Sequence, residues 1–405
     1  MEQRREALVA ELRAKGIALS PALERAFLDV PRHLFVPGVY LDAVYRDNVI
    51  ITRRDKFGVP VSSSSQPAIM AIMNTALDVQ PGQHVLEIGT GTGYNAAILA
   101  ALVGESGSVT SVEIDAETAD AAVTHLQRAG FSGVRVVVGD GANGLFDPAS
   151  FDRIISTAAA WDLPDEWATQ LKDDGLLVTP FIFAGMQIGA ALRKQSDGSF
   201  TSTQLFPLGF IALQGEAAPP IRHVRIPGSA LLVSFADGRS VDEAGVHTLF
   251  SDDHELAQWP LDLDVRAVSL FNYYQMFYQP AGYQFVTYHV EEGQMAYGLE
   301  AHGWGMISST SACLIPAGEH RVIHVYGGAE AYLVMVDLAE KWNAAGRPGL
   351  DRCHVRVVPA GGKPYLPPAA ARDDVAVRVF ARPTHNYTLW LEPVAAPQDD
   401  DSSLA

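Results

Sequence analysis

A glycine-rich stretch at residues 85–95, Val-Leu-Glu-Ile-Gly-Thr-Gly-Thr-Gly-Tyr-Asn, constrains the fold of this chain more than any other. Residues 85–88 are a short, mainly apolar run, which is typical of a buried strand in a parallel sheet. Glycines follow at every second position, and residues 96–103 are apolar and alanine-rich, as in a helix. Glycine lets a backbone turn sharply and lets a ligand approach where a Cβ atom would collide. The stretch therefore predicts a strand–turn–helix corner that binds a ligand; the alternative is an ordinary turn without one.

The residue order in this corner favours a cationic ligand over a dinucleotide. A pyrophosphate site uses the spacing G-x-G-x-x-G, whereas here Glu87 precedes glycines at alternate positions. The carboxylate of Glu87 would repel phosphate, but it can accept hydrogen bonds from a cation such as the amino group of S-adenosylmethionine. The arrangement resembles the first motif of the class I methyltransferases.

Strands and helices alternate after this corner. The pattern predicts strands at 107–113, 134–138, 151–157 and 176–179 and helices at 116–129 and 163–171. Such alternation is typical of a doubly wound parallel sheet, whose binding sites lie at the carboxyl ends of the strands. Polar residues fall at these predicted ends: Glu87, Glu113, Asp140 and Thr157. Glu113 comes 20 residues after Gly93, where a carboxylate can bind both ribose hydroxyls of a nucleotide.

Composition limits the class of protein and its partners. A chain of 405 residues with 48% hydrophobic and 19% charged residues is globular and long enough for two domains. The net charge of −18 argues against nucleic acid as a partner. The charged start has no signal-peptide core, and no apolar run could span a membrane, so a cytoplasmic protein is expected. Cys313 and Cys353 match no zinc pattern, so free thiols and no metal site are expected.

Two polar clusters precede the glycine turn. Ser62 to Ser65 come before a predicted helix at 68–77, so their hydroxyls either line a site or cap that helix. Arg53 and Arg54, with Lys56, form a basic cluster in an acidic chain. These cations either attract an acidic peptide or belong to an ordinary solvated surface.

The order of motifs over residues 20–215 resembles the protein-L-isoaspartate O-methyltransferase family. The stretches that carry the resemblance are Val30-Pro-Arg-His-Leu-Phe-Val-Pro37, Ser65-Gln-Pro67, residues 85–95, Gly139-Asp-Gly141, Phe151-Asp-Arg-Ile-Ile155, Thr157-Ala-Ala159 and Phe206-Pro-Leu208. The resemblance implies a class I, Rossmann-like α/β domain at 1–215 that uses S-adenosylmethionine. It also implies an enzyme that methylates a carboxylate.

The resemblance assigns roles residue by residue. It implies that the residues around Gly89 hold the methionine part of the cofactor, Glu113 the ribose, and Asp140 with Gly141 the adenine. The full set of expected cofactor residues is Glu87, Ile88, Gly89, Thr90, Gly91, Gly93, Glu113, Ile114, Gly139, Asp140, Gly141 and Thr157. Ser65 matches the active-site serine, with Ser63 and Ser64 beside it, and the substrate residues expected are Thr157, Ala158, Ala159, Arg53 and Arg54. The family's Thr-Ile-Ser is Ser63-Ser64-Ser65 here, and Ala68 replaces a His or Tyr.

Residues 216–395 have no place in the basic family fold. Pro219-Pro220 suits a linker, and the strand-like runs that follow predict an appended α+β domain, with a disordered acidic tail at 396–405. The segment after residue 328 predicts either a helix from Ala329 or a strand at 332–336. The aromatic segment 271–278 either packs in a core or docks a peptide.

Three functions remain open from the sequence. A long extension resembles actinobacterial relatives that methylate one aspartate of a ribosomal peptide, such as a lanthipeptide, lasso peptide or graspetide, and so install an aspartimide (succinimide). This tailoring role is the expected one, with a ribosomal peptide bearing Asp as the partner. The alternatives are repair of isoaspartyl residues and an inactive cofactor-binding module. The sequence leaves the oligomeric state open.

Overall fold

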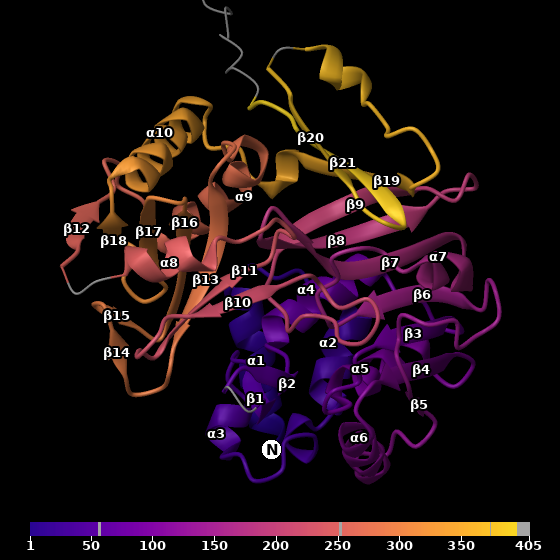
Figure 1. Ribbon diagram of the computed structural model, residues 1–405. Helices are drawn as coiled ribbons and strands as arrows, with labels where there is room; N and C mark the ends of the chain where they lie inside the picture. The colour runs from indigo at the N-terminus through magenta and orange to yellow at the C-terminus, as the bar shows by residue number, and fades with distance from the viewer. Residues whose placement is uncertain (56–57, 251–252, 373, 395–405) are drawn as a thin grey trace, which may run out of the picture.

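The computed structural model describes residues 1–55, 58–250, 253–372 and 374–394. The chain forms two large sheets (Figure 1). The first has 10 strands in the order β20-β21-β19-β9-β8-β7-β6-β3-β4-β5, and the second has 7 in the order β10-β11-β13-β16-β17-β18-β12. The acidic tail expected at 396–405 lies outside the described residues.

The parallel part of the first sheet confirms the predicted alternation of strands and helices. Its strands are β3 (His84–Ile88), β4 (Ser108–Glu113), β5 (Arg135–Val138), β6 (Phe151–Ser156) and the long β7 (Leu171–Phe183). The helices of this half are α1 (Glu2–Ala14), α2 (Pro21–Asp29), α3 (Leu41–Val44), α4 (Pro67–Leu77), α5 (Tyr94–Val103), α6 (Ala116–Arg128) and α7 (Asp165–Gln170), with a 3₁₀ turn at Arg32–Leu34. Asp115 caps α6 by accepting the Thr118 N–H at 2.9 Å.

The sheet then continues with antiparallel strands from both halves of the chain. β8 (Met186–Lys194) and β9 (Phe200–Pro207) follow β7, and β19 (Cys353–Pro359) pairs with β9 through Arg356–Thr201 and Val357–Phe200. β21 (His385–Leu391) and β20 (Ala376–Ala381) complete the edge, drawn in yellow in Figure 1. The boundary expected at residue 215 therefore does not separate two independent sheets, because the last strands of the chain belong to the first sheet.

The second sheet is wholly antiparallel and lies in the middle of the C-terminal half. Its strands are β10 (Arg222–Arg225), β11 (Leu231–Phe235), β12 (Glu255–Gln258), β13 (Gln284–Val290), β16 (His302–Ile307), β17 (Ser311–Pro316) and β18 (Val322–Gly327). A small ribbon of β14 (Met295–Ala296) and β15 (Leu299–Glu300) lies beside β13. The helices here are α8 (Glu243–Leu249), α9 (Val265–Tyr278) and α10 (Glu330–Ala344), with 3₁₀ turns at Leu350–Arg352 and Pro368–Ala371. The helix expected from Ala329 is thus confirmed and the strand at 332–336 is wrong.

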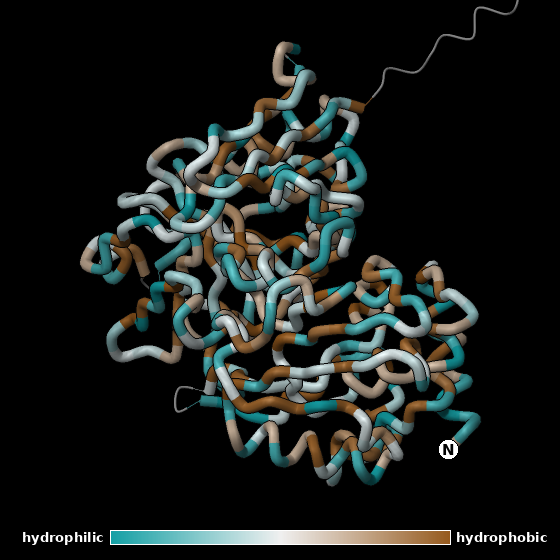
Figure 2. Tube along the Cα trace, turned by 90° about the vertical axis from the view of Figure 1, so that its right-hand side faces the viewer, coloured by the Kyte–Doolittle hydropathy of each residue, from teal (hydrophilic) through white to brown (hydrophobic). Residues whose placement is uncertain are grey.

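One hydrophobic core runs through both sheets. It joins Leu86 and Phe181 of the first sheet to Met306 and Ile323 of the second, with Phe271 of α9 buried among them. Hydrophobic segments accordingly run through the strands inside both halves (Figure 2). The aromatic segment 271–278 mostly fills this core, although Tyr278 is exposed at its end. No helix within the described ranges is long and apolar enough to cross a lipid bilayer.

Candidate active site

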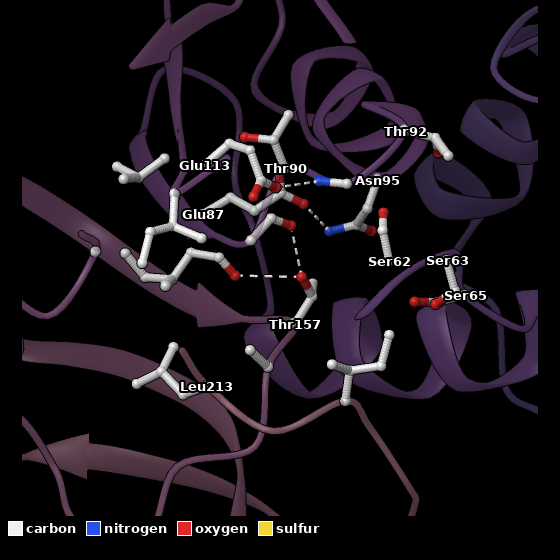
Figure 3. Close-up of a pocket in the computed structure, with 18 of the residues that line it drawn as sticks. Ser62, Ser63, Ser65, Glu87, Thr90, Thr92, Asn95, Glu113, Thr157 and Leu213 are labelled. Atoms are coloured by element: carbon white, nitrogen blue, oxygen red, sulfur yellow. Dashed lines mark hydrogen bonds between the residues drawn. The ribbon is translucent and has the colours of Figure 1, made fainter. Parts of the chain in front are cut away.

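A pocket lies at the carboxyl ends of β3, β4 and β6, where the sequence predicted a ligand site (Figure 3). It encloses about 840 Å³ that no protein atom fills, part of it open to solvent. The predicted residues that line it are Ser63, Ser64, Ser65, Glu87, Ile88, Gly89, Thr90, Gly91, Glu113, Ile114, Asp140, Gly141, Thr157 and Ala158.

The glycine turn is shaped by Thr157, which follows β6. Gly89 has φ +91°, and a Cβ atom there would lie 2.7 Å from Thr157 Oγ1. The Thr157 hydroxyl donates to the Gly89 carbonyl oxygen at 2.6 Å, so the end of β6 is tied to the turn after β3. A side chain at Gly89 is therefore excluded both by its backbone angle and by the packing of Thr157.

Glu87 is the most buried polar group of the pocket. Its carboxylate has no exposed surface and accepts from Asn95 Nδ2 at 2.8 Å and Ser111 Oγ at 2.6 Å. Burial raises the pKa of Glu87 to about 7, although both hydrogen bonds lower it in part. Two protein donors hold this carboxylate at the wall of the pocket that Glu87 lines.

Glu113 and Asp140 also carry protein hydrogen bonds. Glu113 accepts from the Gly91 N–H at 2.9 Å and from the Asp115 N–H at 3.2 Å. Asp140 accepts from the Ala142 N–H at 2.9 Å and from the Glu216 N–H at 2.8 Å. These bonds orient both carboxylates at the ends of β4 and β5 and leave acceptor capacity for a ligand.

The serine segment forms another wall of the pocket. β2 (Pro60–Ser64) pairs with β1 (Ile50–Arg54), and Ser62 to Ser65 line the cavity. The Ser64 hydroxyl is buried without a partner, whereas Ser63 and Ser65 are half-buried. Figure 3 shows Ser63 and Ser65 apart from Glu87 and Glu113; Ser63 lies on β2 and Ser65 between β2 and α4.

The alternative that these serines cap α4 is wrong. The helix begins at Pro67 with Gln66 as its N-cap residue and with no side-chain cap. The N–H of Ala68 is instead satisfied by Asp47 Oδ1 at 2.7 Å. Ala68 itself is buried and does not line the pocket.

Arg32, from the Pro-Arg-His motif, holds the serine segment through a hydrogen bond to its backbone. This arginine has no exposed surface. Its guanidinium donates to the carbonyl oxygens of Val44, Arg46, Asn48 and Ser65 at 2.8–3.2 Å. Burial lowers the pKa of Arg32. The motif therefore acts on the site through the backbone of Ser65.

A segment for which the sequence predicted no role in the site forms another part of the pocket wall. We call residues 208–216 the covering segment; Ile211, Ala212, Leu213 and Gln214 line the cavity. Ala159 holds it in place, because its N–H donates to Ile211 O at 2.8 Å and its carbonyl accepts from the Leu213 N–H at 2.9 Å. β9 ends at Pro207, and beyond it Ala212 forms an isolated β-bridge with Ala159.

Five predicted residues do not line the pocket: Ala159, described above, and Gly93, Gly139, Arg53 and Arg54. Gly93 begins α5, and a Cβ atom there would lie 3.3 Å from the Leu126 side chain of α6. Gly139 donates its N–H to the Glu113 carbonyl at 2.9 Å. Arg53 forms an ion pair with Asp115 at 2.5 Å, and Arg54 donates to the Gly58 carbonyl at 2.8 Å, so neither arginine reaches the cavity.

Other residues lining the pocket were not predicted: Val61, Ser62, Met70, Thr92, Tyr94, Asn95 and Val112. Asn95 stands out, because it donates to Glu87 and its Oδ1 accepts from Asn74 Nδ2 at 2.7 Å. An amide directly after a glycine turn was the available signal. No group of metal-ligating side chains occurs in the part of the chain that the structure describes.

The pocket fits S-adenosylmethionine on its own features. Gly89 and Gly141 leave no room for a side chain. At Gly141, a Cβ atom would lie 2.7 Å from Ile88 Cγ2. Glu113 and Asp140 supply carboxylate oxygens for hydroxyl and amino groups. The pocket-lining residues include acidic groups and no Lys, Arg or His, which suits a cationic ligand.

Known proteins resemble the first half of the chain throughout. A family model described as protein-L-isoaspartate(D-aspartate) O-methyltransferase matches residues 3–218. Protein-L-isoaspartate O-methyltransferases of Dictyoglomus turgidum and Methanopyrus kandleri are each 38% identical over 213 residues, which are 53% and 52% of this chain and 92% of each relative.

A solved protein-L-isoaspartate O-methyltransferase structure matches more of the chain. It covers 87% of this chain and 96% of its own, with 23% identity and a TM-score of 0.50, and this shows a shared fold. The family match spans more than half of the chain, and the site residues described above lie within it. The chain therefore belongs to the protein-L-isoaspartate O-methyltransferase family, whose members are S-adenosylmethionine-dependent methyltransferases.

Proposed function

We propose that this protein methylates the free α-carboxylate of isoaspartyl residues in proteins or peptides. The observation that carries the proposal is the serine segment, which forms a wall of the cofactor pocket and is held by Arg32. An isoaspartyl residue continues the chain through its side chain and leaves the α-carboxylate free. That carboxylate is the acceptor named by the family to which the chain belongs.

The chemistry needs orientation more than acid–base catalysis. When bound, the cofactor supplies an electrophilic methyl group on its sulfonium sulfur. A carboxylate is already a nucleophile, and this agrees with a pocket whose described lining has no His or Lys to act as a base. Orienting the reacting groups can contribute roughly 7–11 kcal/mol in favourable cases.

The residues of this chain divide that task. Ser65, with Ser63 beside it, can donate a hydrogen bond to the acceptor carboxylate without neutralising it. The covering segment and Ala158 supply a further part of the pocket wall. The methyl ester carries a better leaving group than the carboxylate does. The next backbone nitrogen can therefore attack the ester carbonyl, which loses methoxide; the methoxide takes the N–H proton and leaves as methanol, and a succinimide closes.

The second candidate acceptor is a normal L-aspartate in a constrained ribosomal peptide. It is supported by Ser64, which adds a hydroxyl to this wall where the Thr-Ile-Ser pattern of the family has an isoleucine. The length of the chain no longer supports it, because the solved isoaspartyl methyltransferase fold extends over 87% of the chain. Serine-rich walls and long C-terminal halves are both compatible with repair.

One assay separates the two acceptors. The purified protein is incubated with S-adenosylmethionine and three peptides: an isoaspartyl peptide, its normal-aspartyl twin, and a cyclised peptide with a normal aspartate. Mass spectrometry follows the gain of one methyl group and the later loss of methanol. We expect methylation of the isoaspartyl peptide and little of its twin. Methylation of the cyclised peptide alone would reject repair and establish the tailoring role.

A further inference from the structure

The end of the C-terminal half holds a loop of the active site. We call residues 157–163, between β6 and α7, the pocket loop; Thr157 and Ala158 line the cavity and Ala159 holds the covering segment. We call residues 382–387 the clamp turn; they connect β20 to β21 and include the first residues of β21. The two segments are more than 220 residues apart in sequence yet are joined by several hydrogen bonds.

Asp162 and Leu163 are the residues of the pocket loop that form these hydrogen bonds. The Tyr387 hydroxyl donates to Asp162 Oδ1 at 2.8 Å and accepts from the Leu163 N–H at 2.6 Å. Thr384 donates its N–H to Asp162 Oδ2 and its hydroxyl to the Leu163 carbonyl, both at 2.8 Å. The Asp162 carboxylate and both backbone polar groups of Leu163 are therefore bonded to the clamp turn.

Arg382 fixes the remaining side chain of this end of the loop. Its guanidinium carbon lies 4.7 Å from the ring centre of Trp161, 4.6 Å from that of Phe183 and 4.9 Å from that of Tyr387. The arginine is only 7% exposed and donates to the Ile182 carbonyl. Burial lowers the pKa of Arg382 to about 10. A charge held among rings instead of water is costly unless its contacts are good, so the stacking position of Trp161 is closely defined.

We propose that the clamp turn positions the pocket loop for methyl transfer, with Arg382, Thr384 and Tyr387 as positioning residues. The inference rests on the proposed transfer to a peptide carboxylate. At one end the pocket loop continues from β6 with Thr157 bonded to the glycine turn; at the other it is held by the clamp turn. Between these ends Ala160 is bonded to β7, because its N–H donates to the Pro180 carbonyl at 2.9 Å and its carbonyl accepts from the Ile182 N–H at 3.0 Å. Loss of the clamp turn therefore loosens the pocket loop, and through Ala159 the covering segment, without detaching either from the sheet.

The effect should appear in turnover, because misplacing reacting groups by about 1 Å can cost roughly 100-fold in rate. Tyr387→Phe removes the hydroxyl between Asp162 and Leu163 and keeps the ring. Thr384→Val is the milder second variant, because it removes one hydroxyl from a half-buried position. We expect kcat to fall roughly 10- to 100-fold in Tyr387→Phe and less in Thr384→Val, while the affinity for S-adenosylhomocysteine, measured by calorimetry, falls by a smaller factor than kcat.

Thr388→Val is the matched control. Thr388 follows Tyr387 on β21, so its side chain points to the opposite face of the sheet. It is 1% exposed, and its hydroxyl donates to the Tyr365 carbonyl at 2.6 Å, away from the pocket loop. This variant loses a comparable buried hydrogen bond and should keep the wild-type kcat. Equal losses of kcat in Thr384→Val and Thr388→Val would overturn the proposal, because they would report stability alone.

Hydrogen–deuterium exchange separates this proposal from the proposed function. Amides of residues 158–163 should exchange faster in Tyr387→Phe than in Thr388→Val, with or without any peptide. If the wild-type protein methylates none of the peptides, the proposed function fails while the exchange result still decides on the clamp. Unchanged exchange in residues 158–163 of Tyr387→Phe and Thr384→Val would overturn it.

Discussion

Among single residues, Glu87 links the pocket to pH. Its pKa is about 7 in the folded protein because of burial, against an ordinary value of 4.5. Between these values the folded chain holds a proton that the unfolded chain has released, so folding is coupled to proton uptake. The contribution of Glu87 to the free energy of unfolding should therefore fall as the pH rises from about 4.5 to 7.

The substitution Glu87→Gln tests whether the free energy of unfolding falls with rising pH as expected. The amide keeps the shape of the side chain but carries no charge at any pH. Relative to this variant, the wild-type protein should lose on the order of 3 kcal/mol of unfolding free energy between pH 4.5 and 7. Urea unfolding across this pH range measures the difference. Curves that stay parallel would mean that the carboxylate is charged throughout and better solvated than its burial indicates.

Ser65 is the residue on which acceptor orientation depends. Ser65→Ala should leave cofactor affinity unchanged and lower kcat at least tenfold, since hydrogen bonds to charged groups contribute roughly 1.5–3 kcal/mol. Ser63→Ala should have a smaller effect. Calorimetry with S-adenosylhomocysteine and steady-state rates with the isoaspartyl peptide separate binding from turnover. Full activity in both variants would show that neither hydroxyl orients the acceptor.

At the scale of elements, Arg32 connects residues 44–48 to the serine segment by donating hydrogen bonds to carbonyl oxygens of both. Arg32→Met fills similar space but leaves the buried carbonyls of Val44 and Ser65 without this donor. We expect the free energy of unfolding to fall by roughly 2–4 kcal/mol. The KM for peptide should rise more than the dissociation constant of the cofactor, because the serine segment is the part released.

Arg153 offers the control for this prediction. It donates to the carbonyls of Leu77 and Asp78 at the far end of α4, away from the pocket. Arg153→Met should lower the free energy of unfolding without changing the KM for peptide. If both variants raise this KM equally, the effect of Arg32 is general destabilisation.

The sequence predicted local elements better than the contacts between them. Glycine spacing and apolar runs located β3, the turn and the strand ends with Glu87 and Glu113, because these signals lie within a few residues of each other. The role of the covering segment was not predicted, since its conformation depends on hydrogen bonds to Ala159 and not on a repeating pattern of residues. Arg32 and Asn95 were visible as motif residues, but their partners are set by the packing of distant segments.

At the scale of the molecule, the family-matched part of the chain is not self-contained. Its Phe181, Leu192 and Phe200 belong to a core shared with residues after 218. A fragment of residues 1–218 should therefore expose apolar surface and the free edge of β9. We expect it to bind a hydrophobic dye, to associate in sedimentation experiments and to lack a cooperative thermal transition.

The full chain is the reference for that measurement. A fragment that unfolds cooperatively as a monomer would show that residues 219–405 add to a complete domain, as a boundary at 215 implied. No local pattern could have predicted the β9–β19 pairing, because strand periodicity gives the face of a strand but not its partner.

The pairing of β9 with β19 also affects folding during synthesis, because the ribosome makes the two strands at different times. Val355 donates to Ser202 Oγ from 153 residues further along the chain. At about 5–20 residues per second, a ribosome needs roughly 8–30 s to deliver the second strand after the first. Throughout that interval the nascent protein presents an unpaired strand edge to the cell. Folding helpers that shield such edges should matter more for the yield of this protein than for relatives whose sheet is finished earlier in translation.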